Sequence, residues 1–217
     1  HPSEAGAGNG VPMDNGRWTT PFGGLRAFPE VAGGRRRDEG WGMTTIFTVG
    51  HSTRPIEEFI GLLKDHGIDQ LVDIRTIPRS RHNPQFEQDA LAQSLAAAGI
   101  GYVHLTALGG LRHSTGESVN LGWRNESFRN YADYMQTKPF AEGIDELLEL
   151  ANQSQTVIMC AEAVPWRCHR SLVGDALLVR GVTVLDIIGA GEPKPHTLTS
   201  FAVVDGTRIT YPPPEGD

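Results

Sequence analysis

A chain of 217 residues, of which 39% are apolar, is long enough for one domain with a substantial hydrophobic core. The formal net charge of −7 argues against a general nucleic-acid coat protein, because such a protein needs a basic face that releases counterions. No run approaches the roughly 18 apolar residues of a membrane span, and the first residues lack the apolar stretch of a signal peptide. With only two cysteines, the chain is expected to be a cytoplasmic protein with reduced thiols and no membrane partner.

Residues 1–42 differ from the rest of the chain. They contain ten glycines and four prolines, together with the basic run Arg35–Arg37, and they show no sustained apolar period. This composition predicts a disordered extension, or sequence upstream of a natural start at Met43, and a phosphate-binding tail is the alternative. We expect a single domain over residues 43–212 and a flexible tail over residues 213–217.

After this extension, apolar runs that are typical of strands alternate with helical patterns. The first helical pattern has Pro55 in its first turn and ends at Gly67, and its apolar residues fall on one face. Strands are predicted at residues 44–49, 68–75, 100–105, 155–160 and 182–188, and helices at residues 54–67, 86–99, 126–136, 140–152 and 169–181. A Gly-rich loop is expected over residues 106–122, and a closing hairpin over residues 199–212 with its turn at Asp205–Gly206.

The alternation of strands and helices indicates the fold class. It implies right-handed crossovers and a mostly parallel sheet that is covered by helices on both faces. The strand cores IFTV, VIM and VLDII are continuously apolar, as expected for strands that are buried on both faces. We therefore predict a single α/β domain with a mostly parallel sheet, closed by a C-terminal antiparallel hairpin.

Polar and glycine residues gather around the carboxyl ends of four predicted strands. They are His51 and Ser52 after the first strand, Asp73 to Asn83 at the end of the second, Gly109 and Gly110 after the third, and Glu162 to Arg170 after the fourth. In open parallel sheets, ligands bind beyond the carboxyl ends of the strands. We therefore expect these four loops to line one pocket.

The arginines and glycines of these loops point to a phosphorylated or other anionic ligand. Prolines stiffen the loop RTIPRSRHNP, and a stiff loop with several arginines suits a fixed anion site. Glycines let backbone amides approach a phosphate, and the N–H groups at the helix start near Cys168 favour negative charge. The predicted ligand-binding residues are Ser52, Arg75, Ser80, Arg81, Asn83, Gly109, Gly110 and Arg170.

Carboxylates and histidines supply the candidate chemistry. Asp73 and Arg75 lie two residues apart at a strand end, so they share a face, and a carboxylate beside an arginine stays ionised. Glu162 follows a neighbouring strand, where it can act as a base or activate water, and a histidine nearby can shuttle protons. The predicted catalytic residues are Glu162, Asp73, His51, His169 and Cys168.

The two cysteines, Cys160 and Cys168, leave several interpretations open. A cysteine phosphatase loop has five residues between cysteine and arginine, whereas six separate Cys160 from Arg167, so this chemistry is rejected. Their spacing does not match the short pairs of a structural zinc site, and distant His51 would have to complete a four-ligand set, so we predict no metal and no cofactor. A disulfide is sterically conceivable but does not fit a reducing compartment. Cys160 closes an apolar strand and is predicted to be a core thiol, whereas Cys168 at a helix start is predicted to have a lowered pKa and to serve as a nucleophile or redox thiol.

Five motifs together resemble a known family. TVGHS, DIRTIPRSRHNPQF, LGG, FRNYADYM and CAEAVPWRCHR occur in the order found in the bacterial and archaeal family catalogued as "domain of unknown function 488". The resemblance extends over about residues 45–212 and leaves residues 1–42 outside. It implies no established reaction, and it supports the domain boundaries and the choice of the residues around the predicted pocket.

Three functions stay open at this point. The leading hypothesis is an enzyme that acts on a nucleotide, a nucleic acid or another phosphorylated ligand, by carboxylate-based hydrolysis of an N-glycosidic or phosphoester bond. The second is a thiol redox or metal-binding protein that uses Cys168 with Cys160 or His169. The third is a non-catalytic module that binds a nucleotide or nucleic acid through the same pocket. The sequence does not indicate the oligomeric state.

Overall fold

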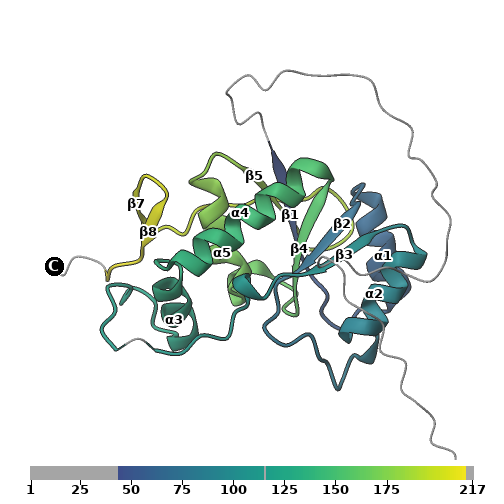
Figure 1. Cartoon of the computed structure of the whole chain (residues 1–217), viewed down its shortest axis with the longest axis horizontal. Helices are drawn as coiled ribbons and strands as arrows, with labels where there is room; N and C mark the ends of the chain where they lie inside the picture. The colour runs from purple at the N-terminus through teal and green to yellow at the C-terminus, as the bar shows by residue number, and fades with distance from the viewer. Residues whose placement is uncertain (1–43, 115, 214–217) are drawn as a thin grey trace, which may run out of the picture. The chain divides into compact units, whose positions relative to one another are not determined.

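The computed structural model describes residues 44–114 and 116–213 (Figure 1). The expectations for residues 1–42 and for residues 214–217 lie outside the described residues. Among the helices of the two described ranges, none combines the length and the apolar character that crossing a bilayer demands.

Six strands of the described ranges form one sheet in the order β3-β2-β4-β1-β5-β6. Five of them are parallel: β1 (Thr45–Gly50), β2 (Gln70–Asp73), β3 (Gly101–His104), β4 (Thr156–Cys160) and β5 (Thr183–Ile187). The short strand β6 (Lys194–Pro195) pairs antiparallel with β5, and β7 (Val203–Asp205) and β8 (Arg208–Thr210) form a separate hairpin. Because β4 and β1 are the central strands, the loops that follow them meet in the middle of the carboxyl edge of the sheet.

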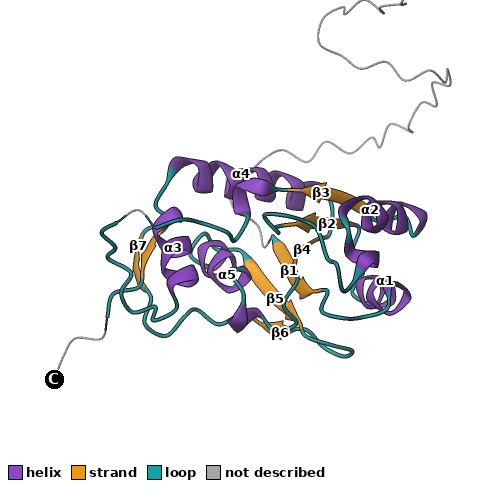
Figure 2. Cartoon of the chain, turned by 90° about the horizontal axis from the view of Figure 1, so that it is seen from below, coloured by secondary structure: helices purple, strands orange, loops and turns teal. Residues whose placement is uncertain are grey.

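Helices lie on both sides of this sheet, as Figure 2 shows. On one side are α1 (Ile56–Asp65) and α2 (Gln88–Ala97), and on the other are α3 (Glu126–Tyr134), α4 (Lys138–Gln153) and α5 (Arg170–Leu178). Short 3-10 helices occupy residues Pro84–Phe86, Thr106–Leu108 and Pro165–Arg167. Each of these lies in a connection that follows a parallel strand.

Two hydrophobic clusters hold the layers together, one on each face of the sheet. On β1, Ile46 belongs to the cluster under α3, α4 and α5, and the next residue, Phe47, belongs to the cluster under α1 and α2. Successive side chains of a strand point to opposite faces, so burial of both faces requires the continuously apolar strands that the sequence contains. The predicted α/β domain, with its mostly parallel sheet, helices on both faces and closing hairpin, is confirmed.

The structure differs from the prediction mainly at the ends of elements. β2 ends at Asp73 instead of Arg75, because the Asp73 carboxylate accepts the backbone N–H of Arg75 at 3.0 Å and turns the chain away from the sheet. β6 was not predicted, since a strand of two residues contains no period that a sequence pattern can reveal.

Candidate functional site

A cavity of about 300 Å³ opens at the carboxyl edge of the sheet. Three loops line it: His51, Ser52 and Thr53 after β1; Arg79, Ser80 and Asn83 after β2; and Ala161, Glu162 and Ala163 after β4. The structure therefore places five of the predicted site residues around one cavity, namely His51, Ser52, Ser80, Asn83 and Glu162. It adds Arg79 and Thr53, which the sequence analysis did not select.

The loop after β4 approaches the end of β1 very closely at Gly50. A Cβ atom at Gly50 would overlap the carbonyl oxygen of Glu162 and lie 3.0 Å from the Cα of Ala163. The backbone N–H groups of His51 and Ser52 donate to the carbonyl oxygens of Cys160 and Ala161 at 3.0 and 2.9 Å. Only glycine at position 50 lets the two loops pair in this way, so one residue determines the shape of the cavity wall.

Ser52 adopts a backbone conformation that is uncommon for its residue type. Its φ of +51° lies in the left-handed region, and within residues 44–114 and 116–213 it is the one non-glycine residue with a positive φ. Such conformations concentrate at binding and catalytic sites, where the surrounding structure holds them in place. The hydrogen bond from the Ser52 N–H to Ala161 is part of that restraint.

Arg170 supports the cavity wall from behind. Its side chain is fully buried, and its guanidinium donates to the carbonyl oxygens of Glu162 and Ala163 at 3.1 and 3.5 Å. Arg170 was predicted to bind the ligand, yet it does not line the cavity. A buried guanidinium needs acceptors, and the carbonyl groups of the loop supply them for its two terminal nitrogens, whereas its Nε has no partner within the described residues.

Asp73 and Arg75 are engaged with each other beneath the loops. The Arg75 guanidinium contacts the Asp73 carboxylate at 2.6 Å, and the Tyr102 hydroxyl donates to the same carboxylate at 2.8 Å. Arg75 also donates to the carbonyl oxygen of Phe86 at 2.9 Å. Neither Asp73 nor Arg75 lines the cavity, because a buried arginine and a buried carboxylate two residues apart satisfy each other first.

His51 is held by the same network. Its Nδ1 lies 2.8 Å from the carbonyl oxygen of Ser52, which can only accept, so Nδ1 carries the proton. Its Nε2 lies 3.3 Å from an Arg75 nitrogen and accepts from it, and the ring stacks on Phe86 with centroids 4.2 Å apart. Burial lowers the pKa of His51, so the imidazole stays neutral. With both nitrogens occupied, His51 fixes the cavity floor and is poorly placed to shuttle protons.

The loop after β2 presents a different arginine to the cavity from those that were predicted. The Ser80 Oγ accepts the backbone N–H of Asn83 at 3.1 Å, and this bond curls the loop. Arg79 is exposed and lines the cavity, whereas Arg81 is exposed outside it. The loop RTIPRSRHNP contains three arginines, and only the curl of the backbone decides which of them faces the cavity.

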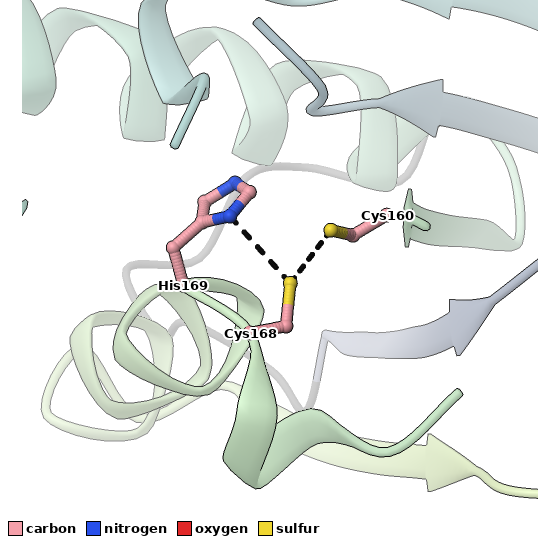
Figure 3. A group of neighbouring side chains, drawn as sticks. All are labelled: Cys160, Cys168 and His169. Carbon is pink, nitrogen blue, oxygen red and sulfur yellow. Dashed lines mark hydrogen bonds between the residues drawn. The ribbon is translucent and has the colours of Figure 1, made fainter. Parts of the chain in front are cut away.

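A second polar group consists of Cys160, Cys168 and His169, which lie at the two ends of the connection from β4 to α5 (Figure 3). The Sγ atoms of Cys168 and Cys160 are 2.6 Å apart, and the His169 Nδ1 lies 3.5 Å from the Cys168 Sγ. Both cysteines are free thiols and both are buried, with 7% and 4% of Cys160 and Cys168 exposed. Cys160 belongs to the cluster under α3, α4 and α5, whereas His51 stacks on Phe86 on the opposite face, so His51 does not join this group.

The two thiols differ in acidity. The hydrogen bond from Cys168 outweighs burial and, with His169, holds the pKa of Cys160 well below its usual value. Burial, together with the proximity of Cys160, raises the pKa of Cys168 well above its usual value. The lowered pKa that the helix start predicts for Cys168 belongs instead to Cys160. For Cys168, the position just before α5 favours the thiolate, but burial disfavours it more strongly, so the pKa rises.

The predicted glycine pair lies beside this cysteine and histidine group and away from the cavity. A Cβ atom at Gly109 would lie 2.7 Å from the Thr76 Oγ1, and a Cβ atom at Gly110 would overlap the His169 ring. The glycines therefore let the loop after β3 pack against His169 and the loop after β2. Neither of them lines the cavity.

Sequence analysis missed a further cavity of about 390 Å³, whose walls include Trp123, Trp166, Ser171, Asp186, Lys194 and His196. His196 bridges two carboxylates there, with Nδ1 2.9 Å from Asp186 and Nε2 3.2 Å from Asp175. Burial opposes the charged imidazole, but the two carboxylates outweigh it and raise the pKa of His196 to about 9. The one available signal was Asp186 itself, a carboxylate inside the apolar run VLDII.

The fold and the site define the class of protein: an α/β protein with a central parallel sheet, whose carboxyl-edge loops surround a small polar cavity. The family model described as "Domain of unknown function DUF488" matches residues 55–177, more than half of the chain, and the protein belongs to this family. The match includes the loops after β2 and β4 but ends before Asp186 and His196. No curated protein and no solved structure matches the chain.

Proposed function

We propose that the protein is a hydrolase that acts on a phosphorylated ligand in the carboxyl-edge cavity, with nucleotides and nucleic-acid fragments as the substrate class. The observation that supports this proposal most directly is the shared cavity of Glu162 and Arg79. An arginine matches the geometry of phosphate oxygens, and hydroxyl and amide groups such as those of Ser80 and Asn83 complete an anion site. Glu162 then supplies the one acidic side chain among the cavity residues.

In the proposed reaction, Glu162 acts as a general base on a water molecule. The carboxylate takes a proton from the water, and the water oxygen forms a bond to phosphorus, or to the anomeric carbon of an N-glycoside. The bond from that atom to the leaving group breaks, and the leaving group takes up a proton from solvent. Arg79 neutralises the phosphate charge, so that the carboxylate and the anionic ligand can share the cavity.

The buried residues beneath the cavity give it the rigidity that such a reaction requires. Arg170 holds the Glu162 loop by its carbonyl groups, and Arg75, itself held by Asp73, contacts His51 in the loop after β1. Catalytic groups need support that fixes them to within a fraction of an ångström. We therefore assign these predicted site residues to positioning, and Glu162 and Arg79 to contact with the ligand.

The test begins without a known substrate, by measuring the melting temperature of the full chain with a panel of nucleotides, nucleic-acid fragments and sugar phosphates. A ligand that binds the folded state raises the melting temperature by mass action. The compounds that stabilise the protein are then incubated with it, and chromatography of the products distinguishes phosphoester from N-glycosidic hydrolysis. No stabilisation by any phosphorylated compound would contradict the proposal.

Three variants separate catalysis from binding. Glu162→Gln should keep the stabilisation by ligand and lose turnover by about 10²–10⁴-fold, because the general base is gone while the shape remains. Arg79→Ala should weaken binding by roughly 10–100-fold, since it removes a charge-assisted contact. Arg81→Ala is the matched control, because Arg81 belongs to the same loop but lies outside the cavity. Undiminished turnover in Glu162→Gln would refute the catalytic role of Glu162. If neither the parent nor any variant shows turnover, and only Arg79→Ala loses binding, the protein is a binding module.

A second candidate function is favoured by a separate observation, the buried group formed by Cys160, Cys168 and His169. Both thiols are free, which fits a reducing, cytoplasmic setting. The thiol redox and metal-binding alternatives both use this group, and the orientation of the His169 ring favours the metal-binding alternative.

A further inference from the structure

The side chains of Cys160, Cys168 and His169 converge on one point from two elements of the fold. Cys160 ends the central strand β4, and Cys168 and His169 directly precede α5 (Figure 3). One ligating atom from each, two Sγ and one imidazole nitrogen, lie within 4.8 Å of one another. Thiolate and imidazole are the donors that zinc prefers, and two cysteines with one histidine and an open fourth position form a known type of zinc site.

The tautomer of His169 directs a lone pair toward the sulfurs. Its Nε2 lies 3.0 Å from the carbonyl oxygen of Ile74, and because a carbonyl can only accept, Nε2 carries the proton. In the neutral tautomer with this proton, Nδ1 keeps its lone pair, and this atom is the one that lies 3.5 Å from the Cys168 Sγ. Metal-binding histidines are held in this way, with the other ring nitrogen donating to a carbonyl or carboxylate.

The His169 ring is held between close neighbours. A Cβ atom at Gly110 would overlap the ring at Nδ1, so only glycine at this position lets the loop after β3 approach the imidazole so closely. The ring also packs on Tyr131, with centroids 5.0 Å apart. The backbone N–H of Arg170 lies 3.4 Å from the Cys168 Sγ and donates to it, a contact that stabilises a thiolate.

We propose that Cys160, Cys168 and His169 bind one thiophilic divalent metal ion of the zinc type through two thiolates and the His169 Nδ1. In a tetrahedral site with metal–sulfur and metal–nitrogen bonds of about 2.3 and 2.0 Å, sulfur and nitrogen lie about 3.5 Å apart, and two sulfurs about 3.7 Å apart. The observed Cys168 Sγ to His169 Nδ1 distance of 3.5 Å already fits this geometry. The two sulfurs, at 2.6 Å, have to separate by about 1 Å, which a side-chain rotation supplies.

Metal binding requires that the two thiols lose their protons. In the metal-free protein one thiol donates to the other, so at least one sulfur keeps its hydrogen. Coordination requires both sulfurs as thiolates, and the displaced protons leave to solvent. Three protein ligands leave the fourth position to water or a bound anion, which is the arrangement of zinc sites that take part in chemistry. Metal binding here does not require that the hydrolase proposal is correct, because the metal site shares no ligating side chain with the carboxyl-edge cavity.

The test uses the full chain, reduced and metal-free, titrated with Co²⁺ as a spectroscopic probe and then with Zn²⁺. Tetrahedral thiolate coordination should give intense visible bands and a near-ultraviolet charge-transfer band that saturate at one Co²⁺ per chain and vanish when Zn²⁺ displaces it. Cys168→Ser and His169→Asn should weaken binding by more than the 10–100-fold that loss of an outer hydrogen-bond partner costs. His82→Gln, at an exposed histidine outside the group, should bind as the parent does.

Two measurements on the unmodified chain keep the proposal falsifiable if a variant fails to fold. Zn²⁺ should slow the reaction of both native thiols with a thiol reagent, and it should raise the melting temperature. A weak octahedral Co²⁺ spectrum, or thiols whose reactivity Zn²⁺ leaves unchanged, would overturn the proposal. Mass spectrometry gives a further test on protein that was reduced and then kept with Zn²⁺. A mass two hydrogens below that of the reduced chain would also overturn the proposal, since it identifies a disulfide between the two cysteines. Glu162→Gln should bind Co²⁺ normally, so failure of the hydrolase proposal is seen separately.

Discussion

The buried charges around His196 predict a pH dependence of stability that a single substitution removes. The His196 side chain is 6% exposed and lies between the carboxylates of Asp175 and Asp186. Burial alone would lower the pKa of His196, but the two carboxylates raise it to about 9. In the unfolded chain the same imidazole titrates near its ordinary value of about 6.5. Between these two pH values, the folded protein holds one proton more than the unfolded chain.

The pKa of His196 is higher in the folded protein than in the unfolded chain by roughly 2.5 units. This difference corresponds to about 3 kcal/mol of folding free energy. Because the folded-state pKa is raised, this contribution is fully present below a pH of about 6.5. It is lost as the pH rises to about 9 and through it, at up to about 1.4 kcal/mol per pH unit. Other groups also titrate in this range, so the quantity to measure is the difference between the parent and a variant.

The assay is urea unfolding of the parent chain and of His196→Gln at several pH values from about 6 to about 9.5. The free-energy difference between the two proteins should shrink by roughly 3 kcal/mol across this range. His82→Gln, which removes an exposed histidine, serves as the control and should follow the parent at every pH. A difference between the parent and His196→Gln that stays constant with pH would show that His196 does not hold the extra proton.

Two further predictions concern the cavity wall and the extent of the domain. Gly50→Ala places a Cβ atom 2.6 Å from the Glu162 carbonyl carbon, and because backbone does not yield easily, we expect a loss of roughly 3 kcal/mol, or about 5–10 °C in melting temperature, together with loss of ligand stabilisation. A melting temperature within about 2 °C of the parent would contradict the close approach of the two loops. We also propose that residues 43–212 form one domain, because within the part of the chain that the structure describes both hydrophobic clusters lie between Ile46 and Tyr211. A chain that begins at Met43 should therefore melt within about 2 °C of the full chain in calorimetry, and a larger drop would refute these boundaries.

The fold could be predicted, as could the convergence of the loops at one edge of the sheet. Both follow from the alternation of strands and helices along the chain. Continuously apolar strands separated by amphipathic helices leave a parallel sheet as the arrangement that buries both strand faces. Parallel strands bring their following loops to one edge, and this is why His51, Ser80 and Glu162 were predicted to lie together. The structure places all three around the cavity.

The roles of single residues could not be predicted, because they depend on burial and on partners that are distant in sequence. Arg75 satisfies the buried Asp73 and Tyr102 network, and the choice between Arg79 and Arg81 depends on one hydrogen bond that curls their loop. His196 was missed because its partner Asp175 lies 21 residues away, with only the two-residue strand β6 to mark its position. A sequence pattern shows the types of residues and their spacing, but it does not show which hydrogen-bonding groups pair with each other in the folded chain.

The segment from Cys160 to Arg170 combines so many reactive residues because its two sides face different surroundings. On one side, the backbone from Ala161 to Ala163 forms a cavity wall that presents Glu162 to solvent. On the other side, Cys160 and Cys168 face inward to His169, in the core between β4 and the helices. Arg170 links the two sides, because its side chain binds the carbonyl groups of the wall and its backbone N–H contacts the Cys168 sulfur.

If a metal draws the two sulfurs apart, Arg170 is the residue through which that movement reaches Glu162. A double-mutant cycle between Cys168→Ser and Glu162→Gln, measured by residual turnover with and without Zn²⁺, should then show a coupling only when Zn²⁺ is present, and strict additivity in both conditions would show that the two sites act separately.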